Sequence, residues 1–362
     1  MALTQTPLKK LFERLTSERR LRLYVWLSLA TQILIVVTGG LVRLTGSGLG
    51  CPTWPKCTDD SLVSTPEMGI HGLIEFGNRL LTIVLLIIAL LTFITILRPH
   101  PGKSELTKIT VAFFAFVGLF IVGLVFATIS IDVLSISLLA TASLGMLAMA
   151  ATFIFAARKF ETKGLAIPAF GLGFGIILQA VVGGITVLTQ LNSWIVGLHF
   201  LISSALIVLA SLLVFRALPK PAFDTCPGAR ALRYPVVAVS AVTIFIGVLV
   251  TGAGPHAGDA LTPRNGLDLE VWQHYHSYPG YLMLALVVVQ WFLQVRRSKS
   301  LLRNLASRTL TILVLVTIAQ AIIGLAQARL GVPPFLVALH MLGAGALSSL
   351  ITFQFLSLRK SN

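Results

Sequence analysis

Ten long apolar runs limit what this chain of 362 residues can fold into. A helix needs about 20 apolar residues to cross the hydrocarbon core of a bilayer. Backbone groups in lipid must also be hydrogen-bonded within the protein, which favours helices. We therefore predict an all-α, polytopic membrane protein with about ten spans, at residues 24–44, 71–97, 107–129, 134–157, 166–188, 195–217, 234–253, 272–295, 306–327 and 335–357.

The charged residues are few and unevenly placed. They make up 11% of the chain, whereas a soluble domain carries about a quarter. The net charge of +15 lies in short segments between the apolar runs, which argues against nucleic-acid binding. With ten spans, every basic segment falls on one side of the membrane, so both termini are expected in the cytoplasm. We predict a multi-pass inner-membrane protein that contacts lipid and no nucleic acid.

The chain contains an internal repeat. Gln179 begins the sequence Gln-Ala-Val-Val-Gly and precedes His199 by 20 residues, and Gln320 begins Gln-Ala-Ile-Ile-Gly and precedes His340 by 20 residues. Thr-Gly-Ser-Gly at 45–48 likewise matches Thr-Gly-Ala-Gly at 251–254. Both copies start on the same side of the membrane. We therefore expect two pseudo-symmetric four-helix bundles related by an axis along the membrane normal.

The first copy of the repeat carries an insertion. Aligning Asn78 with His276 leaves 101 residues before Gln179 but only 44 before Gln320. The 57 additional residues suffice for two spans, and we assign them to a peripheral helical hairpin at about 103–163, which contains neither histidine nor cysteine. The predicted halves are residues 1–233, which include this inserted helix pair, and residues 234–362.

Three of the seven histidines, His199, His276 and His340, lie a few residues inside a predicted span, next to an outer loop. An ionisable side chain at membrane depth is costly and marks a functional candidate. A hydrogen bond between helices would explain any one of them. Matched positions in a repeat favour haem ligation instead, because helical bundles hold haem between histidines of facing helices. His276 and His340 form the expected pair, with His274 as the competitor of His276.

In the first half, the position that matches His276 is Asn78, which is a poor iron ligand. His71 lies two helical turns earlier and is a candidate substitute. Glu75 lies one helical turn after His71 and has two interpretations. It is either a helix-start acid stabilised by the helix dipole or an acid–base and charge-stabilising group beside a haem edge. Arg79 can pair with Glu75 or with a haem propionate.

Cys51 and Cys57 lie in the first outer loop. Outside the membrane the compartment favours disulfides. The pair is then either a structural staple or a redox-active bond, and the spacing leaves both interpretations open.

Several of these motifs together resemble the haem A synthases. They are Gly-Gly-Leu-Val-Arg at 39–43, Thr-Gly-Ser-Gly-Leu-Gly-Cys-Pro-Thr-Trp-Pro-Lys-Cys at 45–57, His-Gly-Leu-Ile-Glu-Phe-Gly-Asn-Arg at 71–79, Gln-Ala-Val-Val-Gly-Gly-Ile-Thr at 179–186 and Thr-Gly-Ala-Gly-Pro-His-Ala-Gly-Asp at 251–259. The resemblance covers most of the chain outside the insertion. It implies oxidation of the C8 methyl of haem O to a formyl group in two successive hydroxylations, giving haem A.

The resemblance also implies roles for particular residues. His276 and His340 would hold a haem B cofactor, His199 would belong to the half that takes the haem O substrate, and Glu75 would be the catalytic acid. The expected partners are a haem O synthase and the assembly of cytochrome oxidase. The chain departs from many members of the family in its two additional spans and in Asn78.

Two other classes of function compete with this interpretation. A di-haem membrane cytochrome that passes electrons between quinol and a partner explains the opposed histidines. It does not explain Glu75 or the Cys51 and Cys57 pair. A transporter built on a repeat would place charged residues near the membrane midplane, whereas the candidates here lie at the outer ends of the spans.

Overall fold

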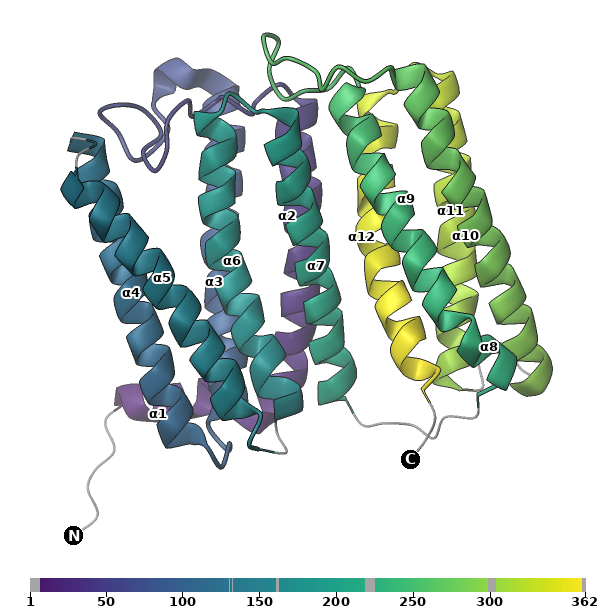
Figure 1. Cartoon of the computed structure of the whole chain (residues 1–362), viewed down its shortest axis with the longest axis horizontal. Coiled ribbons are helices and arrows are strands. Elements are labelled where there is room, and N and C mark those ends of the chain that lie inside the picture. The colour runs from purple at the N-terminus through teal and green to yellow at the C-terminus, as the bar shows by residue number, and fades with distance from the viewer. Residues whose placement is uncertain are drawn as a thin grey trace. The chain divides into compact units, whose positions relative to one another are not determined.

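The computed structural model describes residues 7–129, 131, 133–160, 163–218, 225–298 and 304–359. These residues form helices and loops and contain no strand (Figure 1). Ten of the helices are long and apolar enough to cross a membrane. The predicted all-α class and the ten spans are therefore confirmed.

The helices follow one another along the chain, with long connections between α2 and α3 and between α9 and α10. Their bounds are α1 Pro7–Leu15, the 3-10 helix η1 Glu18–Arg20, α2 Leu21–Leu44, the 3-10 helix η2 Pro66–Met68, α3 Gly69–Leu97, α4 Lys103–Ile129, α5 Val133–Ala157, α6 Lys163–Leu188, α7 Ser193–Ala217, α8 Pro227–Ala231, α9 Arg233–Ala253, α10 Leu269–Ser298, α11 Leu305–Arg329 and α12 Pro334–Ser357. Most of the turn that we placed at 130–132, between α4 and α5, lies outside the described residues.

The two copies of the repeat share an unusual turn. Gln190 and Leu191, between α6 and α7, both have positive φ angles, of 52° and 58°. Gly331 and Val332, between α11 and α12, have φ angles of 74° and 59°. The amides of Leu191 and Val332 each bind a carbonyl five residues earlier, both at 2.7 Å. A positive φ is strained for a β-branched residue such as valine, so both copies adopt this conformation despite its cost.

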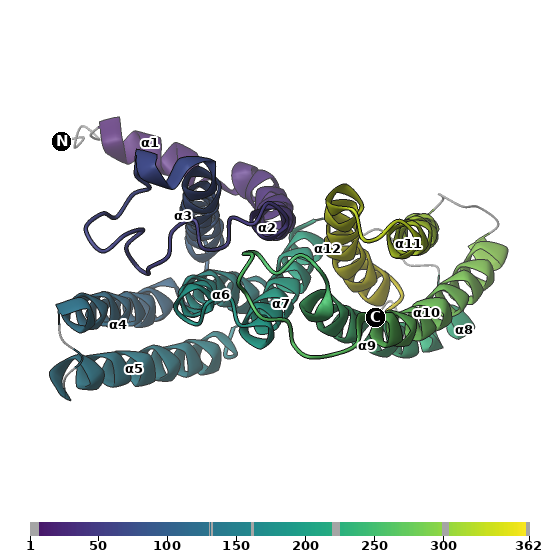
Figure 2. The ribbon, with the colours of Figure 1, turned by 90° about the horizontal axis from the view of Figure 1, so that it is seen from above.

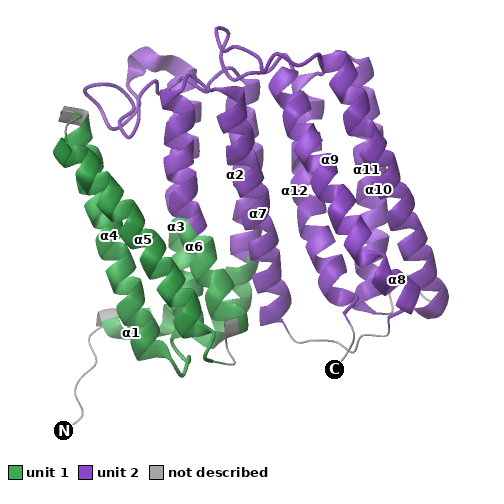
Figure 3. Ribbon diagram, viewed as in Figure 1, with its two compact units in different colours: residues 1–26, 86–174 green, residues 27–85, 175–362 purple. Residues whose placement is uncertain are grey.

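The chain divides into two compact units (Figure 3). Unit 1 comprises residues 1–26 and 86–174, and unit 2 comprises residues 27–85 and 175–362. The inserted helices α4 and α5 belong to unit 1, whereas every residue that we proposed for the site belongs to unit 2. The division of the sequence at residue 233 is a different grouping and stays a prediction.

Within unit 2, helices α9 to α12 form a closed bundle (Figures 1 and 2). Helix α10 packs against α9 and α11, and α12 packs against α11 and α9. Helix α7 contacts α9 and α12 in the same unit. A buried apolar cluster, which includes Val236, Val287, Leu310 and Leu313, fills the bundle near the start of α9. The short helix α8 packs against α10 and is too short to be detected from periodicity in the sequence.

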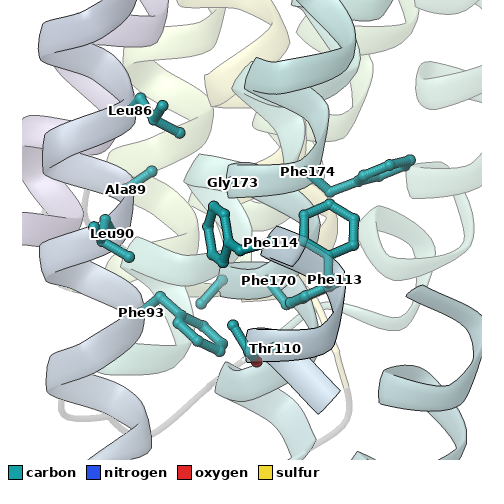
Figure 4. A pocket seen from close by; sticks show the side chains of 11 residues that line it. Leu86, Ala89, Leu90, Phe93, Thr110, Phe113, Phe114, Phe170, Gly173 and Phe174 are labelled. Carbon is teal, nitrogen blue, oxygen red and sulfur yellow. The ribbon is translucent and has the colours of Figure 1, made fainter. Parts of the chain in front are cut away.

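Unit 1 is centred on phenylalanines. The rings of Phe153 and Phe170 stack with centroids 4.1 Å apart and planes inclined by 11°. Phe93 and Phe113 contact the same Phe170 ring edge-on. A small apolar cavity lies beside them, lined by side chains of α3, α4 and α6 (Figure 4). Aromatic packing of this kind gives the inserted helices a rigid attachment within unit 1.

We expect Phe153→Ala to destabilise unit 1 by about 3 kcal/mol, because the truncation removes a stacked ring and leaves a cavity. Phe153 is fully buried. The measurement is thermal unfolding of the purified protein in detergent. Phe155→Ala is the matched control, since that side chain is 66% exposed and should face lipid. Equal losses of stability in the two variants would contradict the packing role of Phe153.

Candidate functional site

The two histidines predicted as a pair in the second half face each other. His276 on α10 and His340 on α12 have ring centroids 6.2 Å apart. Nδ1 of His276 lies 3.0 Å from the backbone carbonyl of Thr243. A carbonyl only accepts hydrogen bonds, so Nδ1 carries the proton in a neutral ring and Nε2 keeps its lone pair. Histidine ligands of metals are commonly oriented by such a bond.

A glycine on the neighbouring helix lies beside each ring, and the approach at Gly247 is too close for a side chain. A Cβ atom at Gly247 of α9 would lie 2.9 Å from Cε1 of His276. A Cβ atom at Gly324 of α11 would lie 3.5 Å from Cε1 of His340. The Nδ1 atom of His340 is buried and has no hydrogen-bond partner among the described residues. Buried polar atoms are nearly always paired, so this one calls for an explanation.

His274 is not part of this pair. It is exposed, and its Nδ1 lies 2.7 Å from the carbonyl of Glu270, on its own helix. Residues two apart on an α-helix point to nearly opposite sides. The structure thus brings His276, and not His274, to His340.

The first half repeats the arrangement around His199. This residue lies on α7, and a Cβ atom at Gly183 of α6 would be 3.3 Å from its Cε1. Its Nδ1 is buried without a partner in the described part of the chain, as in His340. Gln179, one turn before Gly183, donates to the carbonyl of His199 at 2.9 Å and to Ser203. The corresponding Gln320 packs against the backbone of Gly343, so both glutamines contact the helix that carries the histidine.

The other candidate positions of the first half are already bound to neighbours. Oδ1 of Asn78 accepts a hydrogen bond from Thr38 of α2 at 2.8 Å. His71 lies in the first turn of α3, and its Nδ1 is 2.8 Å from the hydroxyl of the buried Ser47. His71 is itself exposed, at the end of α3 that carries the outer loop. These hydroxyl partners were not predicted, because a serine or threonine in a loop or helix gives no specific signal.

Glu75 and Arg79 form an ion pair one turn apart on α3. The Arg79 guanidinium lies 2.6 Å from Oε1 of Glu75, and Oε2 accepts from the backbone N–H of Cys51 at 2.5 Å. Arg79 also donates to the carbonyls of Cys51, Thr53 and Lys56, at 2.9, 3.0 and 3.1 Å. Glu75 is 5% exposed. We considered Glu75 and a haem propionate as partners of Arg79, and the structure places Glu75 beside it. Both side chains bind the loop at 51–57, called the cysteine loop below.

The cysteine loop is compact and closed by a bond between Cys51 and Cys57. Both sulfur-bearing residues are fully buried. The Trp54 side chain from this loop lies against Gly184 on α6, where a larger residue would collide with the indole. The loop thus lies over the outer ends of α3 and α6, next to the residues proposed for the first-half site.

A second set of contacts joins the outer loops of the two halves. Arg43, at the end of α2, donates to the carbonyls of His256 and Thr251. The amide of Gly48 donates to the carbonyl of Gly258 at 2.8 Å. His256 then donates from Nε2 to the carbonyl of the α11–α12 turn, at 2.9 Å. Arg43 belongs to the motif at 39–43, but the sequence did not indicate its role, because its partners are backbone carbonyls, which every residue has.

Unit 2 therefore has the features of a multi-pass membrane protein with histidines near those ends of its helices that carry the loop of Cys51 and Cys57. The chain belongs to the family described as COX15-CtaA, cytochrome oxidase assembly protein, whose model matches residues 22–128 and 138–348. This match confirms the family resemblance that the motifs predicted.

Individual relatives cover different shares of the chain. Heme A synthase of Listeria monocytogenes is 26% identical over 94% of this chain and 97% of that protein. Heme A synthase of Geobacillus thermodenitrificans is 33% identical over 19% of the chain and 20% of that protein. Protoheme IX farnesyltransferase of Thermus thermophilus is 35% identical over 23% of the chain, and the match spans 13% of that longer protein.

We expect the bond between Cys51 and Cys57 to be present in the purified protein. It joins two residues that are six positions apart in the sequence, and Arg79 already binds carbonyls of this loop, so bonding requires little further ordering. Alkylation without reductant, followed by mass spectrometry, should label Cys226 alone, because it is the free cysteine. Reduction before alkylation should add two labels. Two labelled thiols at positions 51 and 57 without reductant would show that the bond is absent.

Proposed function

We propose that this chain is a haem A synthase of the bacterial inner membrane, with both termini in the cytoplasm. Its reaction would convert the C8 methyl of haem O to a formyl group through two successive hydroxylations. The observation that carries the proposal is the asymmetry of two matched sites. The second half has a facing histidine pair, whereas the first half has one equivalent histidine, His199, together with Asn78 and the carboxylate of Glu75. A cofactor site and a substrate site should differ in this way.

The second-half site suits a haem B cofactor. A porphyrin supplies four nitrogens, so the protein needs to give only two axial ligands. Metal–imidazole bonds are about 2 Å long, and a centroid separation of 6.2 Å leaves room for one iron between the rings of His276 and His340. The bond from His276 to Thr243 orients that ring with Nε2 free. When bound, haem B would supply a one-electron redox centre.

The first-half site suits a substrate that must enter and leave. His199 is buried with an unpaired Nδ1 and is our candidate for the residue that orients haem O. Asn78, at the position that matches His276, would bind iron weakly. His71, two helical turns nearer the start of α3, is the other candidate ligand. A weaker ligand set is appropriate for a haem that is released after reaction. Trp54 of the cysteine loop packs against Gly184 on α6 and would cover this end of the site.

Glu75 is our candidate for the catalytic carboxylate. Each hydroxylation of a methyl group on the porphyrin rim with water removes two electrons, which must pass to an electron acceptor outside this chain. The oxidation leaves cationic character at that carbon, which water then attacks. A nearby carboxylate would stabilise the charge and accept the proton of the attacking water. The hydrogen bonds from Arg79 and Cys51 hold Glu75 in one place. Such fixed positioning reduces the reorganisation needed during the reaction.

The comparisons support a role in haem modification. The Listeria and Geobacillus relatives are named as haem A synthases, and the Thermus relative is named for transfer of a farnesyl group to protohaem IX. Haem O, the proposed substrate, is itself a farnesylated haem. We therefore propose a haem O synthase as the supplier of the substrate and cytochrome oxidase assembly as the destination of the product.

Changing His276 or His340 to Ala should abolish the spectrum of a low-spin haem with two histidine ligands, because such a centre needs both. The protein should be purified from cells that supply haem and measured in the oxidised and reduced states. His274→Ala is the matched control and should keep the spectrum, since His274 points away from the pair. Loss of the spectrum in His274→Ala, with retention in His276→Ala, would reverse the assignment.

Glu75→Gln should stop haem A formation while leaving haem B bound. The amide keeps a hydrogen-bonding group of the same size but loses the negative charge, and a catalytic carboxylate is worth about 10²–10⁴-fold in rate. Haem extracted from the membranes should contain haem O or a partly oxidised haem in place of haem A. Glu67→Gln, an exposed acid of the same outer region, is the control and should remain active.

The same haem extraction tests the proposed function itself. The unmodified protein should yield haem B together with haem O or haem A. Haem B alone would favour a membrane cytochrome. Near-normal formation of haem A by Glu75→Gln would leave Glu75 as a structural partner of Arg79 and require another catalytic group.

A further inference from the structure

The N-terminal helix α1 is strongly amphipathic and takes no part in the proposed function. Leu11, Phe12 and Leu15 follow the spacing of one helical face. Lys9, Lys10 and Arg14 lie on the remaining surface. Residues 7–22 contain six basic and two acidic residues, which gives a net charge of +4. The segment thus joins an apolar stripe to a positive surface.

Contacts within unit 1 fix the orientation of α1. Arg98, just after α3, donates to the carbonyl of Glu13 and to the hydroxyl of Thr16, both at 3.1 Å. Its guanidinium also lies 3.8 Å from the Glu13 carboxylate. The hydroxyl of Tyr24, in the first turns of α2, donates to the carbonyl of Leu15 at 2.8 Å. These bonds hold α1 from the side of Glu13, opposite the apolar stripe.

The apolar stripe remains uncovered by the described protein. Leu11 is 52% exposed and Phe12 is 51% exposed. The helix ends six residues before α2 begins at Leu21, and α2 is a candidate membrane span. Because α1 is attached so close to this entry point, its stripe must lie near the level of the lipid headgroups.

We propose that α1 is an interfacial helix that binds the anionic phospholipid surface of the cytoplasmic leaflet. Leu11 and Phe12 enter the boundary between headgroups and acyl chains, as is typical of amphipathic helices that lie in the interface. Lys9 and Arg14, at the flanks of the stripe, reach the phosphate groups of anionic lipids, whose surface potential attracts such segments. The combination of a short apolar stripe and a positive charge fits a lipid surface better than the apolar face of another protein.

Spin labels on the intact protein test this proposal. In a Cys226→Ser background, a nitroxide is attached to Phe12→Cys or, as the matched control, to Lys10→Cys. The proteins are placed in nanodiscs of phosphatidylcholine with or without phosphatidylglycerol, and collisions with oxygen and with a water-soluble nickel chelate are measured. In the anionic discs, the label at 12 should favour oxygen and the label at 10 should favour the nickel chelate.

Charge removal provides the second arm of the experiment. Each of Lys9→Gln and Arg14→Gln should lower the ratio of docked to undocked helix by roughly fivefold, because a basic residue near an anionic surface contributes about that factor. High salt should act in the same direction. Access of nickel to position 12 in anionic discs, or equal docking without phosphatidylglycerol, would overturn the proposal. Shielding of position 12 from both reagents that grows with protein concentration would also overturn it, since a second copy would then cover the stripe.

Discussion

The hydrogen-bonding demand of the backbone in lipid is the constraint on which the rest of this structure depends. A helix satisfies its own N–H and C=O groups, so the chain crosses the bilayer only as helices. Irregular backbone is then confined to the ends of the spans. The exposed carbonyls of the outer loops are bound there by Arg43, Arg79 and His256. The candidate site lies at this same end, where polar side chains and non-helical backbone occur together.

Duplication explains how one short sequence pattern builds two sites. In each copy a glutamine binds or packs on the next helix, and a glycine one turn later lies beside the histidine ring. The turn before each histidine helix passes through the same strained conformation, at Leu191 and at Val332. The helices therefore start in the same way in both copies. Differences between the sites come from the other positions, chiefly Asn78 in place of a histidine.

Sequence reasoning predicted the fold well, because apolar length and the placement of charge report directly on membrane spans. It also predicted the pairing of His276 with His340, since the repeat gave the register. The interactions of Glu75 with the Cys51 amide, of Asn78 with Thr38 and of His71 with Ser47 were not predictable. They depend on how a loop folds over helix ends, and backbone groups or common hydroxyls leave no pattern in the sequence.

The glycines beside the histidines determine how such a site can be lost by mutation. The rings of His276 and His199 approach Gly247 and Gly183 closely, which is possible because glycine has no side chain. A single methyl group at Gly247 would press on the His276 ring, although the histidine itself would be unaltered. Loss of a binding site can therefore begin on a helix that contributes no ligand. A sequence comparison limited to the histidines would not detect this loss.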